Sequence, residues 1–543
     1  MSSSPHQPPP PPATLAALPQ YAADAYGTRE ALADGEVRRS FVRLNEDIAA
    51  ATRAALAHGV RRGDRVAIWA PNSRRWITAA LGAVCAGGVL VPVNTRYKAA
   101  EAADILRRSG ATVLLTERGF LGTDYVAALH ESGEDLGALR STVVLRGEPG
   151  GRATGWQDYL AAGERTDDAD RLARIAEVRP DDLCDILYTS GTTGRPKGVT
   201  TTHAQTVRLY GDWSRLVTLR TGDRYLLVNP FFHTFGYKAG ILACLLRGAT
   251  MLPEAVYDAD RILHRMAAER VTCLMGPPTV FHGLLHHPRR AAHDLSALRL
   301  AGTGAAAVPT ELVERIRNSL GAPDVFTAYG LTETGGVVSV CPTDADARTV
   351  ARTVGLPLPG TEVRIADPLG GALPVGEPGE VQVRGYHVMH GYLDDEAATA
   401  EAVLPGGWLR TGDIGMLDAR GFLTLTDRLK DMYVVGGFNA YPAEVENVLL
   451  GHRSITDVAV VGAPDERLGE VGVAFIVTAP PTDPAAAAGL TPEALTAWTR
   501  ERLANFKVPR RFVPVESLPR NAGGKLLKGE LRRAARGEDT PGT

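Results

Sequence analysis

A glycine- and hydroxyl-rich segment between Tyr188 and Gly198 has the composition of a loop that binds an anion. It reads Tyr-Thr-Ser-Gly-Thr-Thr-Gly-Arg-Pro-Lys-Gly and follows a short apolar run that predicts a strand. Its glycines free the backbone to curl, so that successive N–H groups can point at one anion. We therefore expect a phosphate site formed by Thr189, Ser190, Gly191, Thr192, Thr193, Gly194 and Lys197. The segment is not a Walker A loop, because Pro196 stands where that motif requires glycine.

The elements that position this loop are predicted by apolar runs that alternate with helical patterns. We expect helices at 73–86 and 99–109, and strands at 66–69, 89–93, 112–115, 186–188, 225–228, 271–274, 298–301 and 325–328. Strands that alternate with helices of this length favour βαβ units and a mostly parallel sheet. From about 350 to 426, short alternating runs between Gly and Pro turns predict an antiparallel, barrel-like β region. The fold class is therefore α/β, with a large N-terminal domain of several layers.

The composition changes after Asp427, which predicts a domain boundary near 427–430. We expect a Pro-rich disordered arm over 1–14, an N-terminal domain over 15–427 and a small α+β domain over 428–543. Strands are expected at 458–461, ended by Gly462, and at 473–477. Thr491 and Pro492 have the residue types of a helix N-cap and first helical position.

Composition limits the class of protein. The 543 residues are 44% apolar and carry a formal charge of −3, which argues against nucleic-acid binding through a strongly basic face. No apolar run reaches the roughly 18 residues of a membrane-spanning helix, and the first residues do not form a signal peptide. The five cysteines form no CxxC pair and are odd in number, which favours a reducing, cytoplasmic compartment. The sequence leaves monomer and homodimer both open.

Five segments in a fixed order resemble the motifs of the adenylate-forming superfamily, which includes acyl- and aryl-CoA synthetases, peptide-synthetase adenylation domains and luciferases. They are the loop at 188–198 and the segments at 329–333, 407–413, 427–431 and 519–525. The resemblance extends over about residues 20–533, and it implies that the C-terminal domain is mobile. It also implies that ATP and Mg²⁺ convert a carboxylate to an acyl-adenylate, from which the thiol of coenzyme A displaces AMP.

The resemblance further implies roles for individual residues. Lys525 bridges the carboxylate and the α-phosphate, and Lys430 is the hinge about which the C-terminal domain rotates. Glu333 and Thr192 hold the metal, and Thr332 supports the phosphates. The other nucleotide contacts are Tyr329 on adenine, Asp413 and Arg428 on ribose, and Gly304, Ala305, Ala306 and Gly330 along the pocket. The coenzyme A contacts are Gly436, Gly437 and Phe438, and His233 is a gate beside an acyl pocket that includes Phe235, Gly236 and Gly330.

Three further segments resemble one group of this superfamily, the actinobacterial ligases for steroid-ring propanoates. They read PFFHTFGYKAGILACL from Pro230, RLGEVG from Arg467 and LANFKVPR from Leu503. That group acts on a bicyclic indanedione that carries a propanoate chain. A terpenoid or another polycyclic propanoate would fit such a pocket equally well, and the superfamily resemblance alone also leaves an aryl or fatty acid open. The same segments favour coenzyme A over a carrier protein as the thiol.

Residues typical of other classes of protein also occur in the sequence. Gly302-Thr303-Gly304-Ala305-Ala306-Ala307 satisfies a dinucleotide-binding pattern, but the acid that follows, Asp324, stands before a strand rather than at its end. The histidine pair His282 and His286 lacks the glutamate of a zinc-protease motif. A non-catalytic nucleotide binder is disfavoured, because the loop, Glu333 and Lys525 all occur. An enzyme that performs only one of the two half-reactions remains an alternative.

Overall fold

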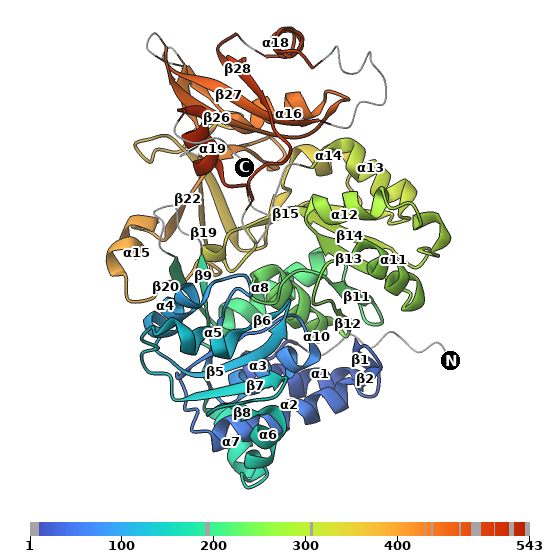
Figure 1. The fold of residues 1–543 in the computed structure, drawn as a ribbon, viewed down its shortest axis with the longest axis vertical. Helices are drawn as coiled ribbons and strands as arrows, with labels where there is room; N and C mark the ends of the chain where they lie inside the picture. Colours follow the sequence, from blue (N-terminus) through green and yellow to red (C-terminus); the bar gives the residue numbers. More distant parts are fainter. Residues whose placement is uncertain are drawn as a thin grey trace. The chain divides into compact units, whose positions relative to one another are not determined.

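The computed structural model describes residues 10–189, 196–304, 308–428, 431–435, 438–465, 468–478, 490–503, 505–520 and 526–537. The chain divides into two compact units (Figure 1). The first comprises Met1–Glu362 with Arg384–Leu409, and the second comprises Val363–Val383 with Arg410–Thr543. The domain boundary expected near 427–430 stays a prediction, and Leu429 and Lys430 lie outside the described residues.

One sheet of the first unit contains the strand that leads to the predicted loop. Its order is β20-β10-β9-β4-β3-β5-β7-β8, with β6 (Thr123–Asp124) paired to β5. The bounds are β3 Arg65–Trp69, β4 Val89–Pro92, β5 Ala111–Phe120, β7 Ser141–Arg146, β8 Thr154–Gly155, β9 Leu183–Thr189, β10 Lys197–Thr202 and β20 Gly391–Tyr392. The pairs from β9 through β4, β3, β5 and β7 to β8 are parallel, whereas β10 is antiparallel to both β9 and β20.

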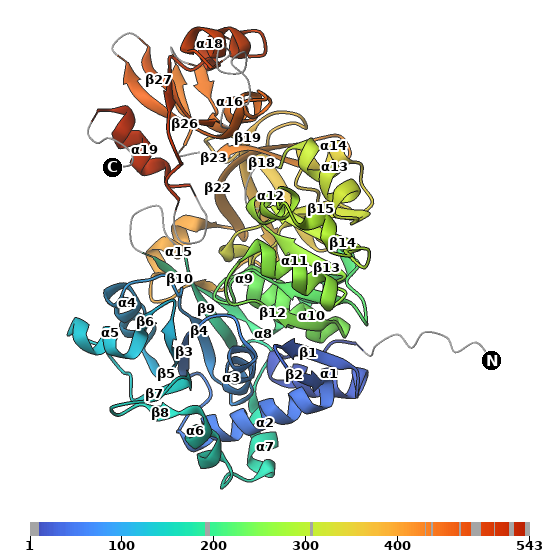
Figure 2. The ribbon, with the colours of Figure 1, turned by 45° about the vertical axis from the view of Figure 1, so that its right-hand side comes forward.

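The side chains of this sheet alternate between two apolar layers. Val66 and Ile68 of β3 pack with α2 (Phe41–Ala57) and α3 (Arg74–Cys85), whereas Ala67 and Trp69 pack with α4 (Ala99–Ser109) and α5 (Tyr125–Ser132). This alternation follows from the two-residue period of a strand. Both faces of the sheet are therefore covered by helices, as parallel sheets require (Figure 2).

The second sheet of this unit has the order β17-β16-β15-β14-β13-β11-β12-β1-β2. Its bounds are β1 Glu30–Asp34, β2 Val37–Ser40, β11 Arg224–Leu227, β12 Thr250–Pro253, β13 Cys273–Gly276, β14 Leu300–Gly304, β15 Asp324–Tyr329, β16 Ser339–Val340 and β17 Leu356–Pro357. Its inner residues join the same apolar cluster as Val66 and Ile68, so the two sheets enclose a common helical layer. The helices α11 (Ala259–Ala268), α12 (Pro278–Leu285) and α13 (Thr310–Ser319) lie beside β13 and β14 (Figure 1).

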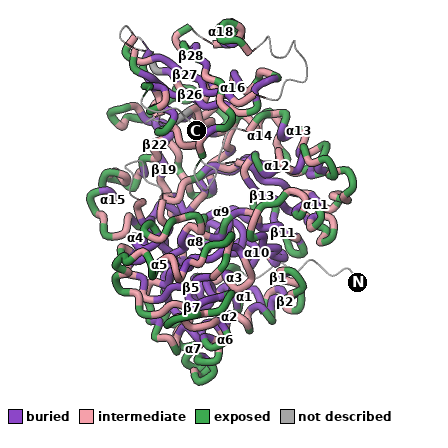
Figure 3. Tube along the Cα trace, viewed as in Figure 1, coloured by how far each residue is buried: buried purple, intermediate pink, exposed green. Residues whose placement is uncertain are grey.

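The remaining helices of the first unit complete these layers. They are η1 Leu15–Ala17, α1 Leu18–Tyr26, α6 Trp156–Gly163, α7 Asp168–Glu177, α8 His203–Leu216, α9 Thr234–Gly236, η2 Tyr237–Leu242, α10 Ala243–Arg247, η3 Arg290–Ala292, η4 Thr332–Thr334, α14 Ala347–Arg352 and α15 Glu396–Ala402. Burial is strongest along the strands and the helices enclosed between the sheets, and α7 is mostly exposed (Figure 3).

A further sheet comprises strands of the predicted antiparallel region. Its order is β18-β19-β22-β21, with β23 paired to β22. The bounds are β18 Thr361–Ala366, β19 Gly379–Gly385, β21 Val403–Leu404, β22 Trp408–Leu417 and β23 Leu423–Arg428. β22 runs antiparallel to β21 and β23, in agreement with the sequence prediction.

The C-terminal residues form a small α+β fold. Its sheet has the order β25-β24-β27-β26, with β28 paired to β27. The elements are β24 Tyr433–Val435, β25 Phe438–Ala440, α16 Pro442–Leu450, β26 Ile455–Asp465, β27 Gly469–Thr478, α18 Pro492–Arg500, η5 Asn505–Lys507, β28 Arg511–Pro514 and α19 Lys528–Ala535. α16 and α18 pack on one face and α19 on the other. The predicted fold class is thus confirmed.

The prediction that Gly462 ends its strand is wrong. β26 continues to Asp465, and Gly462 pairs with Gly472 of β27. A Cβ atom at Gly462 would lie 2.4 Å from Cβ of Tyr433, so the glycine makes room for an aromatic ring. Glycine in a strand can mark such a close approach as well as a strand end. The cap prediction is confirmed, because the Thr491 side chain accepts a hydrogen bond from the Ala494 N–H.

All five cysteines lie among the described residues, and each is a buried, free thiol. No helix of the described ranges combines the length and the apolar character that crossing a bilayer demands.

Candidate active site

The predicted phosphate loop joins β9 to β10, which form an antiparallel hairpin. Thr189 pairs with Lys197 at the end of the hairpin, and the Thr189 hydroxyl donates to the Lys197 carbonyl oxygen over 3.5 Å. Five predicted loop residues lie outside the described residues, namely Ser190, Gly191, Thr192, Thr193 and Gly194. The structure therefore places the two ends of the loop, which are brought side by side by the pairing of the strands.

Arg108 of α4 contacts the chain on both sides of the loop. Its Nη1 atom donates to the carbonyl oxygen of Pro196 over 2.7 Å, and its guanidinium carbon lies 5.4 Å from the centroid of the Tyr188 ring. Asp104, one helical turn earlier, lies 3.3 Å from the same Nη1 atom and holds the guanidinium. Sequence analysis missed Arg108, because the Asp–Arg spacing of four residues indicates only an ion pair on a helix surface.

Tyr392 connects the loop lysine to the predicted metal carboxylate. Its hydroxyl donates to Oε1 of Glu333 over 2.9 Å, and Nζ of Lys197 lies 4.9 Å from the centroid of its ring. Burial, together with the neighbouring Glu333 carboxylate, raises the pKa of the Tyr392 phenol, so the hydroxyl stays protonated and donates. Sequence analysis also missed Tyr392, which reaches this place because β20 pairs with β10.

The backbone around Glu333 is held as firmly as its side chain. The Glu333 carbonyl oxygen accepts from the Met389 N–H over 2.7 Å, while the Glu333 residue as a whole is half-buried. Gly330 precedes this turn, and a Cβ atom there would lie 2.3 Å from the carbonyl oxygen of Gly336. Only glycine fits such a contact, which explains its place between Tyr329 and the acidic turn.

Two predicted nucleotide-pocket residues end neighbouring parallel strands. Gly304 is the last residue of β14 and pairs with Ala328, next to Tyr329 at the end of β15. Ligands of open α/β sheets bind beyond such carboxyl ends. Asp324 begins β15 and pairs with Leu300, the first residue of β14. It therefore lies at the amino ends of these strands, whereas a dinucleotide-binding acid is needed at a carboxyl end. Ala305 and Ala306 lie outside the described residues.

His233 caps the short helix α9. Its Nδ1 atom accepts a hydrogen bond from the Phe235 N–H over 3.2 Å, which leaves the ring proton on Nε2. His233 as a residue is exposed, and desolvation by the surrounding protein atoms lowers the pKa of the imidazole. At Gly236 a Cβ atom would lie 2.2 Å from the Pro230 carbonyl oxygen, so the turn requires glycine. The arrangement presents a neutral imidazole with a fixed tautomer.

The predicted ribose residues of the second unit lie on adjacent strands. Asp413 of β22 pairs with Arg428 of β23, and the Asp413 N–H donates to the Thr411 hydroxyl over 3.1 Å. The side chains of Arg428 and Phe438 are not described, and Lys430, Gly436, Gly437 and Lys525 lie wholly outside the described residues. Thr332 lies in η4 beside Glu333.

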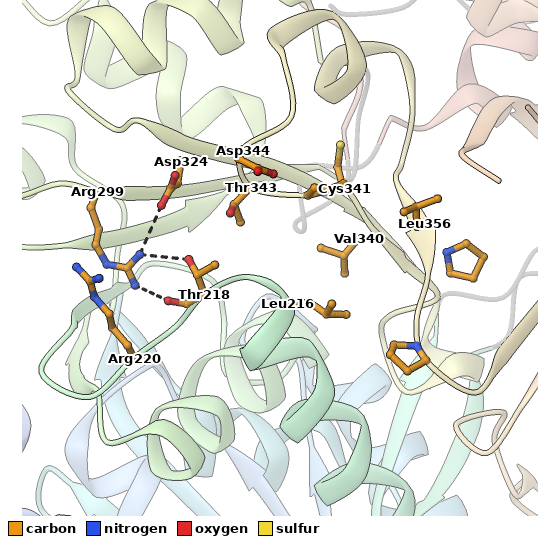
Figure 4. Close-up of a pocket in the computed structure, with 13 residues that line it drawn as sticks. Leu216, Thr218, Arg220, Arg299, Asp324, Val340, Cys341, Thr343, Asp344 and Leu356 are labelled. Carbon is orange, nitrogen blue, oxygen red and sulfur yellow. Dashed lines mark hydrogen bonds and ion pairs between the residues drawn. The ribbon is translucent and has the colours of Figure 1, made fainter. Parts of the chain in front are cut away.

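A cavity of about 640 Å³ lies beside the amino ends of β14 and β15 in the second sheet. Figure 4 shows Arg299 at its end, bound to the Thr218 hydroxyl over 3.2 Å and 3.7 Å from Asp324. Arg299 directly precedes β14 and Asp324 begins β15, so the cavity opens at the amino ends of these strands. Its lining includes none of the predicted site residues that the structure describes.

Comparison with protein families finds matches to both units of the chain. The family model described as "AMP-binding enzyme" matches residues 19–393, and that described as "AMP-binding enzyme C-terminal domain" matches residues 444–525.

Two relatives are named 3-[(3aS,4S,7aS)-7a-methyl-1,5-dioxo-octahydro-1H-inden-4-yl]propanoyl:CoA ligase. The one from Rhodococcus jostii (strain RHA1) is 47% identical over 526 residues, which cover 96% of this chain and 98% of the relative. The one from Mycobacterium tuberculosis (strain ATCC 25618 / H37Rv) is 49% identical over 489 residues, which cover 90% and 92%. A solved structure, the anthranilate CoA ligase AuaEII in complex with anthranoyl-AMP, is similar with a TM-score of 0.86 and 27% identity, over 96% of this chain and 97% of that chain.

Replacing Arg108 tests whether the loop ends need its two contacts. We expect Arg108→Gln to weaken ATP binding about tenfold, because a charge-assisted hydrogen bond at the loop is lost. Arg107→Gln is the matched control, since Arg107 is bound to the same Asp104 at 2.6 Å but, within the described part of the chain, forms no hydrogen bond or ion pair with the loop ends. Isothermal titration with ATP measures both. Equal affinities for the two variants would refute a role for Arg108 in shaping the loop.

Proposed function

The chain belongs to the AMP-binding enzyme family, and we propose that its substrate is a polycyclic propanoate, which it joins to coenzyme A. It is an acyl-CoA ligase, and ATP and coenzyme A are its co-substrates. The family inferred from the five sequence motifs is thereby confirmed. The observation that carries the substrate proposal is the 47–49% identity to two ligases named for an indanedione propanoate.

The reaction consists of two displacements. A carboxylate oxygen of the acid attacks the α-phosphorus of ATP, and pyrophosphate leaves with the electron pair of the broken P–O bond. The sulfur of coenzyme A then attacks the acyl carbon, AMP leaves, and the thiol proton is released. The carboxylate and the phosphates of ATP are both anionic and repel one another in the first step. The protein therefore has to place hydrogen-bond donors and cations around the α-phosphorus.

We propose that the hairpin loop holds the phosphates through Thr189, Ser190, Gly191, Thr192, Thr193, Gly194 and Lys197. The proposal is supported by the paired loop ends and by the contacts of Arg108 with Tyr188 and Pro196. Tyr329, Gly330, Gly304, Ala305 and Ala306 would line the adenine side, and Thr332 would support the phosphates. The position of Gly304 and Tyr329 at neighbouring carboxyl ends of strands favours this assignment.

Glu333 and Thr192 are the residues that would hold Mg²⁺. The Glu333 carboxylate fits such an ion, because it is half-buried, has its backbone fixed by Met389 and has one oxygen oriented by Tyr392. Magnesium prefers one or two carboxylates together with phosphate oxygens and water. When bound, the ion would neutralise charge on the phosphates.

The other roles belong to the second unit and to the acyl side. We propose that Asp413 and Arg428 bind the ribose, as their cross-strand pairing favours. Lys525 would reach the α-phosphate, Lys430 would be the hinge, and Gly436, Gly437 and Phe438 would contact coenzyme A. On the acyl side, His233 would separate the carboxylate from the thiol path, with Phe235 and Gly236 beside it. A neutral His233 suits this place, because a cation there would compete for the carboxylate.

A panel of acids tests the substrate proposal. We expect pyrophosphate release with an indanedione propanoate or another ring-fused propanoate to exceed that with octanoate or a simple aryl acid by at least about tenfold in kcat/KM. Coenzyme A should convert the adenylate to thioester and AMP. Equal turnover of octanoate would exclude selection for a polycyclic acid. Pyrophosphate release without thioester formation would favour an enzyme that performs only the first half-reaction.

Replacing Tyr392 tests the metal site. Tyr392→Phe keeps the ring near Lys197 but removes the hydrogen bond to Glu333, so the carboxylate loses its orientation. We expect the Mg²⁺ concentration for half-maximal adenylation to rise about tenfold, as for other residues that orient a metal ligand. An unchanged Mg²⁺ requirement would show that Tyr392 does not orient the ligand.

Lys525→Ala should lower adenylation by about 10²–10³ and leave thioester formation from a supplied acyl-adenylate largely intact. The reason is that a lysine beside the α-phosphorus serves only the first displacement. Lys528→Ala is the control, because Lys528 is bound to Glu446 at 2.8 Å. Equal loss of both steps in Lys525→Ala would contradict the assigned role.

A further inference from the structure

A lysine and an aspartate form an ion pair deep in the first unit. Nζ of Lys238 lies 2.9 Å from Oδ1 of Asp185, and both side chains are 0% exposed. Removing two such charges from water is unfavourable, and their attraction offsets this cost only when further hydrogen bonds are present. A contribution to stability is therefore not enough to explain why this ion pair is buried.

The hydrogen bonds around this pair are present. Nζ of Lys238 donates to the hydroxyls of Thr201 at 2.8 Å and Thr206 at 3.4 Å, and the Thr201 hydroxyl donates to Oδ1 of Asp185 at 2.7 Å. The Cys184 thiol donates to Oδ2 of Asp185 at 3.2 Å. Burial lowers the pKa of nearby His203 to about 4, so this imidazole is neutral and Lys238 balances the charge of Asp185.

The pair joins two segments that the proposed function uses together. Asp185 lies on β9, which ends at Thr189, and Thr201 lies on β10, which begins at Lys197. Lys238 lies in η2, which directly follows the helix that His233 caps. The network thus links the hairpin that carries the phosphate loop to the turn that carries the histidine.

The segment around Lys238 is a π-helix, a rare conformation that occurs frequently at functional sites. Gly236, in the turn before the π-helix, packs against Pro230. Gly240, within the π-helix, packs against Leu227, and a Cβ atom at Gly240 would lie 3.0 Å from Cδ2 of Leu227. Because these contacts leave little freedom, a shift at Lys238 would move His233 with it.

We propose that Lys238 and Asp185 are positioning residues, which hold the His233 turn in a fixed place relative to the β9–β10 hairpin. This inference rests on the proposed function, in which the acid enters beside His233 and ATP binds the loop. Reacting atoms have to be placed within a fraction of an ångström, and a misplacement of about 1 Å can cost about 10²-fold in rate. The pair would therefore act on the rate of adenylation more than on the affinity for ATP.

Double replacement separates positioning from stability. Lys238→Met and Asp185→Leu alone each leave a buried charge without its partner, and we expect melting temperatures at least about 5 °C lower. The double variant Lys238→Met/Asp185→Leu leaves no unpaired charge at this position and should melt near wild type. Its kcat for acid-dependent pyrophosphate exchange should nevertheless fall at least about tenfold, with KM for ATP within about threefold.

The matched control replaces another largely buried pair, Glu254 and Arg265, which lie 2.6 Å apart. Arg265→Met/Glu254→Leu should leave kcat unchanged. A Lys238/Asp185 double variant that regains both the melting temperature and the wild-type kcat would reduce the pair to a structural role and overturn the proposal.

Thr201→Val provides a second test if the double variant does not fold. It removes the hydroxyl shared by Lys238 and Asp185 but leaves both charges. We expect a folded protein with kcat reduced several-fold, and a wild-type kcat would overturn the proposal. Wild-type protein is assayed first: without exchange there, the proposed function fails, whereas exchange that the variants leave unchanged refutes only the positioning role.

Discussion

The antiparallel pairing of β9 with β10 is the interaction on which the other contacts of the candidate site depend. β9 is parallel to β4, so a chain leaving β9 would ordinarily cross over through a helix. Instead the chain returns at once as β10, and this return creates the loop and brings its ends together. β10 then pairs with β20, which places Tyr392 between Lys197 and Glu333. A disturbance of the hairpin would therefore separate the loop from the carboxylate.

The same hairpin also carries part of the buried charge network. Asp185 and Thr201 lie on its two strands, and Lys238 reaches them from the π-helix. A surface ion pair contributes little rigidity, because water competes for both partners. A pair with no exposure has no such competition, so its geometry is fixed by the surrounding strands. The protein thus uses charge in the core where position matters.

Much of this could be predicted from the sequence, and the missing parts have a common cause. The helix at 99–109 and the strand at 66–69 were visible because their apolar periods are strong and local. Tyr392 and Arg108 could not be found in this way, because their roles arise from pairing and packing between distant segments. Gly462 was misread since a glycine beneath an aromatic ring looks in sequence like a strand end. Lys238 did leave a signal, a lysine inside an apolar run, which requires a buried partner.

A crystal structure with a non-hydrolysable acyl-adenylate analogue, an acyl-sulfamoyl adenosine, tests most directly whether the loop between β9 and β10 holds the nucleotide. We expect the sulfamate to contact the loop between Thr189 and Lys197 and the adenine to lie against Tyr329. Tyr392 should still donate to Glu333 in that complex. An analogue bound in the cavity beside Arg299 and Asp324, with no contact to the hairpin loop, would show that this loop does not hold the nucleotide.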